Sequence, residues 1–362
     1  MMKKISIIIL TTLLFLVLLS PTIVQAQNKI TILDSSVEAE FPSGLSFNLS
    51  AKSDVNIIDI RLCYVVDQAS FAQVTSEVYI EFVPATNIDA HWEWDMRKTG
   101  GLPPGSNVDY WWIVVDTNNN RVETTPSRIQ FDDNRYPWQS LTQNEITIYW
   151  YQGNKTFAQE IMLSAQQALN QLANDTGAKL NKPVQLYIYA DATHLQSAMI
   201  YPQEWTGGVA YTRYGILAIG ISPSNPNWGK RAIAHELTHL TIHQMTLNPY
   251  NNLPTWLDEG LAMYTEGPLS PEYIAYLNKA AIKNNLISTQ SLSSPFSAYA
   301  EESYLSYAQS YSLVEFLISN YGQDKMLSLL NNFRQGSSYN RALEKVYGFD
   351  MAELDTLWKN YY

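Results

Sequence analysis

One short run of residues limits the fold of this chain more than any other feature: the stretch 231–243, which reads RAIAHELTHLTIH. It contains the pattern H-E-x-x-H, formed by His235, Glu236 and His239. Apolar residues recur around these three at helical spacing, which predicts a largely buried helix. Residues four positions apart lie one above the other on a helix, so both imidazoles project from one face. Two neutral imidazoles in this arrangement can hold one zinc ion, with Glu236 close enough to act on a water molecule beside it.

A zinc site that catalyses hydrolysis needs three protein ligands and one open position, so the pattern requires a further ligand elsewhere in the chain. The stretch 253–264, which reads LPTWLDEGLAMY, supplies Glu259. Thr255 and Asp258 have the spacing of a capping box, which would place Glu259 in the first turn of a second helix. We therefore expect Glu259 to complete the zinc site of the two histidines.

Taken together, the motifs H-E-L-T-H and W-L-D-E-G-L-A resemble the gluzincin branch of the zinc metallopeptidases, and more closely the bacterial peptidase MA-like domain. The resemblance covers roughly residues 142–362. It implies an α+β metallopeptidase domain with a mostly helical C-terminal lobe, in which His235, His239 and Glu259 bind Zn²⁺. It also implies hydrolysis of peptide bonds by zinc-activated water, with Glu236 as the general base that takes the proton and later passes it to the leaving amine.

The segment 306–317, SYAQSYSLVEFL, is similar to the helix that carries the transition-state tyrosine of the zinc aminopeptidases. The match places that tyrosine, a second catalytic residue, at Tyr307. Tyr304 and Tyr311 occupy adjacent turns of the same face, so the sequence leaves the choice among the three open. All three are also acceptable as core aromatics.

The segment 207–211, GGVAY, falls where gluzincins have the active-site edge strand, which binds the substrate backbone by strand addition. The G-A-M-E-N sequence of the aminopeptidases is absent here, and no anchor for a free substrate N-terminus is recognisable. These two observations favour an endopeptidase.

Two further residues lie near the motifs. His243 continues the helical face of the zinc histidines, but it is eight residues from His235, about 12 Å along a straight helix. We expect it to pack or to support a ligand, not to bind the ion. Glu266 follows Glu259 by two helical turns and could orient a zinc histidine or face solvent.

The rest of the chain indicates a multidomain organisation. Lys3 and Lys4 precede an apolar run, and a small-residue cleavage site follows, so residues 1–26 are expected to be a secretory signal peptide, or an uncleaved N-terminal anchor. Short β-branched and aromatic runs over 29–132 predict an all-β sandwich, similar to immunoglobulin and fibronectin-type domains. Polar residues 133–144 are expected to be a linker, and 145–362 the peptidase domain.

The composition of the chain indicates its compartment and source and excludes some classes of binding partner. The formal net charge of −11 makes nucleic acid or an anionic membrane surface a poor partner. Cys63 is the one cysteine, so no intrachain disulfide is possible, and a secreted chain without disulfides suggests a prokaryotic source. It lies in an apolar run and is expected to be a buried strand residue. The mature chain has no second run that would span a membrane.

We therefore predict a secreted zinc metallopeptidase that acts on a peptide or protein substrate, with a β-sandwich that positions the peptidase domain or binds an extracellular partner. One alternative is an extracellular binding protein whose protease-like domain holds zinc without turnover, and another is zinc-dependent hydrolysis of a non-peptide substrate. The natural substrate, the cleavage preference, latency and the oligomeric state do not follow from the sequence.

Overall fold

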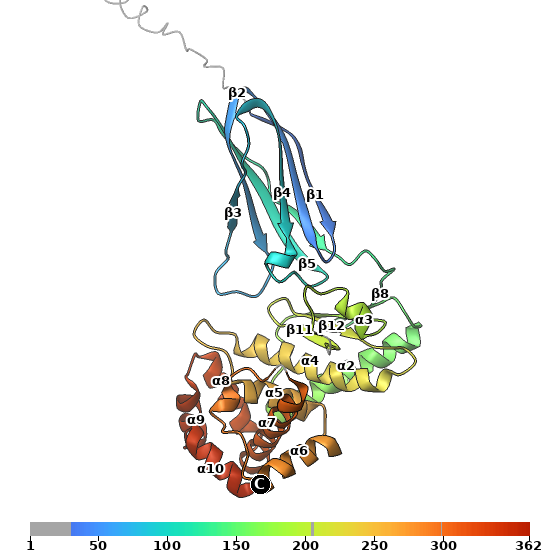
Figure 1. Cartoon of the computed structure of the whole chain (residues 1–362), viewed down its shortest axis with the longest axis vertical. Helices are drawn as coiled ribbons and strands as arrows, with labels where there is room; N and C mark the ends of the chain where they lie inside the picture. Colours follow the sequence, from blue (N-terminus) through green and yellow to red (C-terminus); the bar gives the residue numbers. More distant parts are fainter. Residues whose placement is uncertain (1–29, 204–205, 298) are drawn as a thin grey trace, which may run out of the picture.

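The N-terminal part of the molecule is an all-β sandwich in the computed structural model, which describes residues 30–203, 206–297 and 299–362 (Figure 1). The expected signal peptide, residues 1–26, lies outside these residues. The sandwich contains β1 (Thr31–Glu40), β2 (Gly44–Val66), β3 (Ser76–Tyr79), β4 (Ala85–Asp95), the short helix η1 (Met96–Lys98), β5 (Ser106–Asp116), β6 (Arg121–Glu123) and β7 (Ser127–Phe131).

Strand β2 belongs to both layers of the sandwich. Its first half pairs with β1 and β4, and its second half pairs with β3 and β5. A register shift between Lys52 and Ile57 marks where the strand passes from one layer to the other. A single strand of 23 residues therefore connects the two layers.

The core of the sandwich forms because alternate residues of the strands point inward. Leu45, Phe47 and Leu49 on β2 are buried, and the residues between them are partly exposed. Trp112 of β5 is fully buried in the same core. Cys63 is 2% exposed, so the expectation of a buried strand cysteine is confirmed.

A second sheet and two long helices follow the sandwich. The elements are β8 (Gln139–Gln143), β9 (Ile146–Trp150), α2 (Lys155–Thr176), β10 (Val184–Tyr189), α3 (Ala192–Gln196), β11 (Gly208–Tyr211), β12 (Ile216–Gly220) and α4 (Pro226–Thr246). The strand order is β11-β12-β10-β9-β8, with the three inner strands parallel and both outer strands antiparallel to their neighbours. Apolar residues of α2 and α4 share one core with β9, β10 and β12, so these helices cover one face of the sheet.

The connection between the sheets is shorter than the expected linker 133–144, because residues 139–143 of that segment form β8. The remainder is fixed to the second sheet. The carboxylate of Asp133 is buried, and it accepts hydrogen bonds from the guanidinium of Arg135 at 2.7 Å and from the hydroxyl of Tyr189 at 3.0 Å. The ring of Tyr136 stacks on Tyr151 with 4.1 Å between ring centroids.

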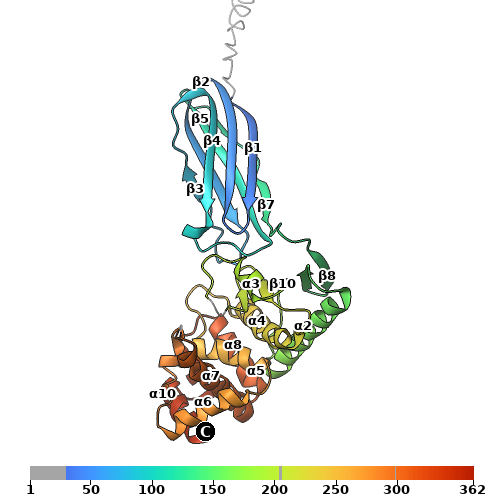
Figure 2. The ribbon, with the colours of Figure 1, turned by 45° about the vertical axis from the view of Figure 1, so that its right-hand side comes forward.

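The sandwich ends beside the part of the chain that holds α3 and β10 (Figure 2), and there it contacts the hairpin formed by β11 and β12. The amide of Ala69 donates a 2.6 Å hydrogen bond to the carbonyl of Arg213 in the hairpin turn. Tyr214 of the same turn and Ile200 pack against the sandwich core. The sandwich thus supports the turn of the hairpin that includes the edge strand β11.

The C-terminal lobe is helical, as expected. Its elements are α5 (Thr255–Thr265), α6 (Pro271–Ile282), η2 (Ser291–Ser293), α7 (Ala300–Tyr321), α8 (Gln323–Arg334), α9 (Tyr339–Tyr347) and α10 (Met351–Tyr361). They enclose a core in which Trp256 and Trp358 are almost fully buried. No helix in the described part of the chain has the length and apolarity needed to cross a membrane. The expected fold class, an all-β sandwich followed by an α+β peptidase-type domain with a helical lobe, is confirmed.

Candidate metal centre

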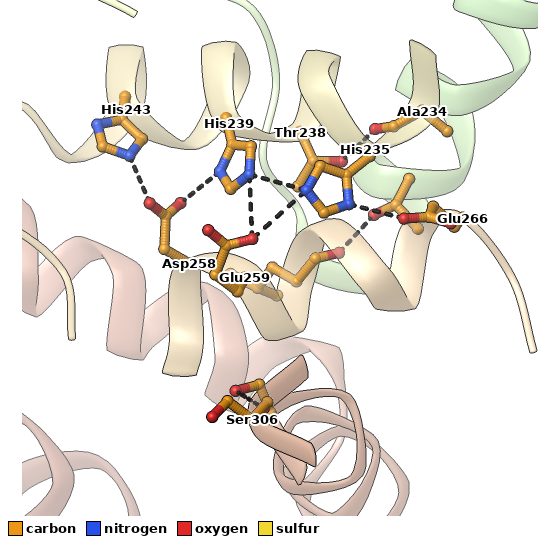
Figure 3. Close-up of polar contacts among 12 residues, drawn as sticks. Ala234, His235, Thr238, His239, His243, Asp258, Glu259, Glu266 and Ser306 are labelled. Carbon is orange, nitrogen blue, oxygen red and sulfur yellow. Dashed lines mark hydrogen bonds and ion pairs between the residues drawn. The ribbon is translucent and has the colours of Figure 1, made fainter. Parts of the chain in front are cut away.

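The centre lies between α4 and α5 (Figure 3). His235 and His239 project from one face of α4, and their Nε2 atoms lie 3.2 Å apart. Glu259 reaches toward them from α5, with its Oε2 atom 3.4 Å from Nε2 of His235 and 3.5 Å from Nε2 of His239. Three ligand atoms, two from one helix and one from the next, therefore converge on one point.

Carboxylates on the far side of each ring set the orientation of both imidazoles. Nδ1 of His235 lies 2.7 Å from Oε1 of Glu266, and Nδ1 of His239 lies 2.9 Å from Oδ1 of Asp258. When each imidazole is neutral, as a metal ligand must be, these contacts place its ring proton on Nδ1 and leave the lone pair of Nε2 facing the centre. Such outer partners are typical of metal-binding histidines.

The second oxygen of Asp258 holds His243, whose Nε2 atom is 2.8 Å from Oδ2. His243 thus contacts the partner of a ligand and does not join the three converging atoms. His239, His243 and Asp258 also lie close enough together to form a second candidate metal-binding group. Asp258, however, is at hydrogen-bond distance from both imidazoles, which is the geometry of a residue that orients His239.

Helix α5 begins differently from the sequence expectation. Its N-cap is Pro254, the hydroxyl of Thr255 donates to the carbonyl of Ser293, and Asp258 faces the histidines. The predicted capping box is therefore wrong, and Glu259 lies in the second turn. The reason is that two partly buried imidazoles give the Asp258 carboxylate a stronger partner than a helix terminus does.

Gly260 brings α5 close to α7, immediately after Glu259. A Cβ atom at this position would lie 2.4 Å from the carbonyl oxygen of Ser310 on α7. Only glycine permits this approach between the two helices. The close packing fixes the height at which Glu259 meets the histidines.

The spacing of the three ligand atoms fits a zinc ion. Zinc lies about 2.0–2.2 Å from nitrogen and oxygen ligands, so two ligands at a tetrahedral angle are roughly 3.3–3.6 Å apart. The observed separations of 3.4 and 3.5 Å fall in this range, and the separation of 3.2 Å is just below it. Oε2 of Glu259 is also buried and has no hydrogen bond of good geometry among the described residues, so a cation would satisfy it.

The charges of the site lead to the same conclusion. Burial opposes protonation of His235, but Glu259 and Glu266 outweigh burial and raise its pKa to about 9. Burial also opposes protonation of His239, but Asp258 outweighs burial and raises the pKa of His239 well above its usual value. Burial disfavours the charged form of the Glu259 carboxyl, but hydrogen bonds with both imidazoles outweigh burial and lower its pKa to about 2. The donor set therefore favours positive charge at its centre.

Glu236 lies on α4 between the two histidines, with its carboxylate against the edge strand β11. A Cβ atom added at Gly208 would lie 3.2 Å from Oε1 of Glu236. Burial raises the pKa of this carboxyl. β11 ends the strand order of the described sheet, so one of its edges pairs with no other strand of that sheet.

Tyr307 is the tyrosine of α7 whose pKa is affected by the carboxylates of the centre. Burial raises the pKa of its phenol, and the charges of Glu259 and Glu236 raise it further. Its ring meets Phe296 edge-on, with 5.2 Å between centroids. The phenol therefore lies within electrostatic range of the converging ligands.

The two other candidate tyrosines have different neighbours. Tyr304 packs against Tyr273 of α6, with 5.6 Å between ring centroids. Tyr311 packs against Tyr264 at 5.7 Å, and its pKa is raised to about 12 by burial and by Glu315. Both serve the packing of the helical lobe.

Sequence reasoning missed Asp258 as a partner of His239 and His243. The available signal was the pair of adjacent acidic residues in W-L-D-E-G, because neighbouring carboxylates on one helix turn can serve a ligand and its support. Glu266, for which two alternatives were open, lies against His235 and also contacts Arg231 at 3.4 Å.

Two histidines one turn apart on a buried helix, with a glutamate from the next helix, define a gluzincin-type metallopeptidase domain. A family model described as the Peptidase MA superfamily matches residues 164–362. This is more than half of the chain, and the chain belongs to that superfamily. A comparison with curated proteins found no match.

Several solved structures share distant similarity with the chain. An M1 zinc metallopeptidase from Deinococcus radiodurans is 11% identical, with 91% of this chain and 94% of that chain covered and a TM-score of 0.34. Legionella pneumophila aminopeptidase A, solved with aspartic acid, is 10% identical, with 91% and 50% covered and a TM-score of 0.40. OgpA from Akkermansia muciniphila, solved in a catalytically inactive form with an O-glycopeptide, is 9% identical with a TM-score of 0.22. The matched region covers 30% of this chain and 30% of the OgpA chain.

Proposed function

We propose that this protein is a zinc-dependent peptidase in which His235, His239 and Glu259 hold the metal. The observation that carries the proposal is the convergence of three ligand atoms at 3.2, 3.4 and 3.5 Å. Membership of the Peptidase MA superfamily supports the same function. Zinc in this position supplies a Lewis acid that polarises a water molecule and the scissile carbonyl.

The chain's own residues would carry the proton and the developing charge. Glu236, between the two histidines on α4, takes the proton of the attacking water and passes it to the leaving amine. Tyr307 donates its phenol proton in a hydrogen bond to the carbonyl oxygen as negative charge develops there. The position of Glu236 against Gly208 supports this assignment, because it brings the base to the edge where a substrate backbone can bind.

We propose an endopeptidase. An extended peptide can add to the free edge of β11 through main-chain hydrogen bonds, which recognise backbone at any point of a chain. The segment preceding α4 reads GGVAY and lacks the G-A-M-E-N sequence of the aminopeptidases, which supports cleavage away from a free N-terminus.

We also propose that the protein is secreted by a prokaryote, with residues 1–26 removed or retained as an N-terminal anchor. The β-sandwich would then meet an extracellular partner or hold the peptidase domain in position. Its contact with the turn of the β11–β12 hairpin through Ala69 supports the second role.

The experiment that tests the function combines metal analysis with a peptide-library cleavage assay on the full chain. We expect about one zinc per chain and cleavage that stops when zinc is removed by a chelator and returns when it is added back. Glu236→Gln should keep zinc and fold but lose at least about a hundredfold in turnover, because an amide cannot accept the proton. Zinc binding without any cleavage would support the alternative, a binding protein with an inactive protease-like domain.

A further inference from the structure

Trp228 is a large apolar side chain that is half exposed beside the proposed site. It lies in the first turn of α4, the helix that carries His235 and Glu236, and it is 53% exposed. Its six-membered ring meets the backbone of Gly207, where an added Cβ atom would lie 2.6 Å from the ring. A side chain at this position would have to displace the end of the indole ring.

The next glycine, Gly208, lies close to Glu236, with 3.2 Å from an added Cβ to Oε1. Consecutive Cα atoms are about 3.8 Å apart, so the indole and the proposed base approach one dipeptide. That dipeptide is held in place, because the carbonyl of Gly207 accepts a 3.0 Å hydrogen bond from the amide of Gly220. Trp228 and Glu236, eight residues apart on α4, therefore approach neighbouring residues of the segment that leads into β11.

A substrate added to the free edge of β11 advances by about 3.3 Å per residue. The substrate residue beside Trp228 is then one or two positions from the bond that Glu236 serves. Antiparallel pairing is the more stable arrangement, and in that direction this residue follows the scissile bond. The open face of an indole accepts an aromatic ring or an aliphatic side chain.

We infer that Trp228 is a specificity-determining residue, which binds an aromatic or large aliphatic side chain one or two positions after the scissile bond. The inference rests on the proposed peptidase function. It adds a substrate class to that function: peptides with a bulky apolar residue just beyond the cleavage point.

The test uses the full chain and a set of peptides that carry Phe, Leu, Ala or Gly at each position on either side of one bond. Cleavage is measured by mass spectrometry. The unmodified protein should prefer Phe or Leu over Gly by about tenfold at one of the two positions after the bond. Trp228→Ala should abolish this preference, and Trp228→Phe should retain most of it. Tyr79→Ala, which removes an aromatic side chain that is 68% exposed on the sandwich, should leave it unchanged.

A second measurement separates this inference from the proposed function. The same peptides are titrated by calorimetry into the zinc-loaded Glu236→Gln variant, with and without Trp228→Ala. If Trp228→Ala removes the preference in affinity for Phe over Gly, the inference is supported, whether or not any peptide is cleaved. Absence of cleavage by the unmodified protein would overturn only the proposed peptidase function. An unmodified chain without the preference, or a preference that Trp228→Ala leaves unchanged, overturns the inference and leaves the peptidase function in place.

Discussion

Oε1 of Glu266 lies 2.7 Å from Nδ1 of His235, although the two residues are 31 positions apart in the chain. A carboxylate partner of this kind fixes the ring orientation and makes the metal-binding nitrogen more basic. We predict that Glu266→Gln lowers zinc affinity by about 10- to 100-fold, measured by competition with a chromogenic chelator. Glu160→Gln, which changes an exposed glutamate paired with Lys230, should leave the affinity unchanged.

His243→Ala should keep zinc, because His243 contacts Asp258 and not the three converging atoms. His239→Ala should lose the metal, since it removes one of those atoms. Elemental analysis of the purified variants measures both outcomes. A zinc-free His243→Ala protein that remains folded would contradict the assignment of ligands.

Tyr307→Phe removes one hydroxyl, so the fold and the zinc content should persist. We expect turnover to fall by roughly a hundredfold with little change in the Michaelis constant, because the lost hydrogen bond strengthens only as charge develops. Tyr304→Phe and Tyr311→Phe serve as controls and should cost much less. If Tyr304→Phe caused the larger loss, the assignment of the donor would be wrong by one turn of α7.

Gly260→Ala should destabilise the protein by about 1–3 kcal/mol, as overpacking does elsewhere. The added methyl group would meet the carbonyl of Ser310 and force α5 away from α7. Zinc affinity should fall as well, since Glu259 moves with α5. Thermal unfolding with and without zinc measures both effects, and Thr356→Ala at an exposed helix position is the control.

Zinc binding at pH 7 should release protons. The pKa of His235 in the metal-free fold is about 9, above its usual value, so protonated His235 contributes stability below about pH 6.5, and this contribution is lost as the pH rises through 9. A zinc ligand must be neutral, so the metal displaces that proton, and affinity should rise with pH up to about 9. Calorimetric titrations in buffers of different ionisation heat count the released protons. Equal heats in all buffers would contradict the prediction.

The spacing of His235 and His239 was sufficient to predict that their imidazoles share one face, because helix geometry alone determines that relation. The prediction that Glu259 lies close to these histidines required the second motif and the family resemblance. Asp258 was misassigned because a capping box and a metal-site support use the same residue type, and only the packed helices decide between them. Its role depends on contacts between α4 and α5, which local sequence does not encode.

Residues 139–143 were expected to be linker because their side chains are polar. An edge strand with one exposed face needs few apolar residues, and its pairing with β9 comes from backbone hydrogen bonds. The choice among Tyr304, Tyr307 and Tyr311 also needed the structure. Helical phase places the three near one face, but the carboxylates near Tyr307 come from other helices.

The contacts of the segment around Asp133 should prevent the sandwich and the peptidase domain from rotating independently. With its carboxylate held by Arg135 and Tyr189, and with Ala69 bonded to the hairpin turn, the two domains should tumble in solution as one elongated particle. A target captured at the far end of the sandwich would then be presented to the cleavage site at a constant reach, so the length of a tethered substrate, and not chance encounter, would determine which of its bonds is cut.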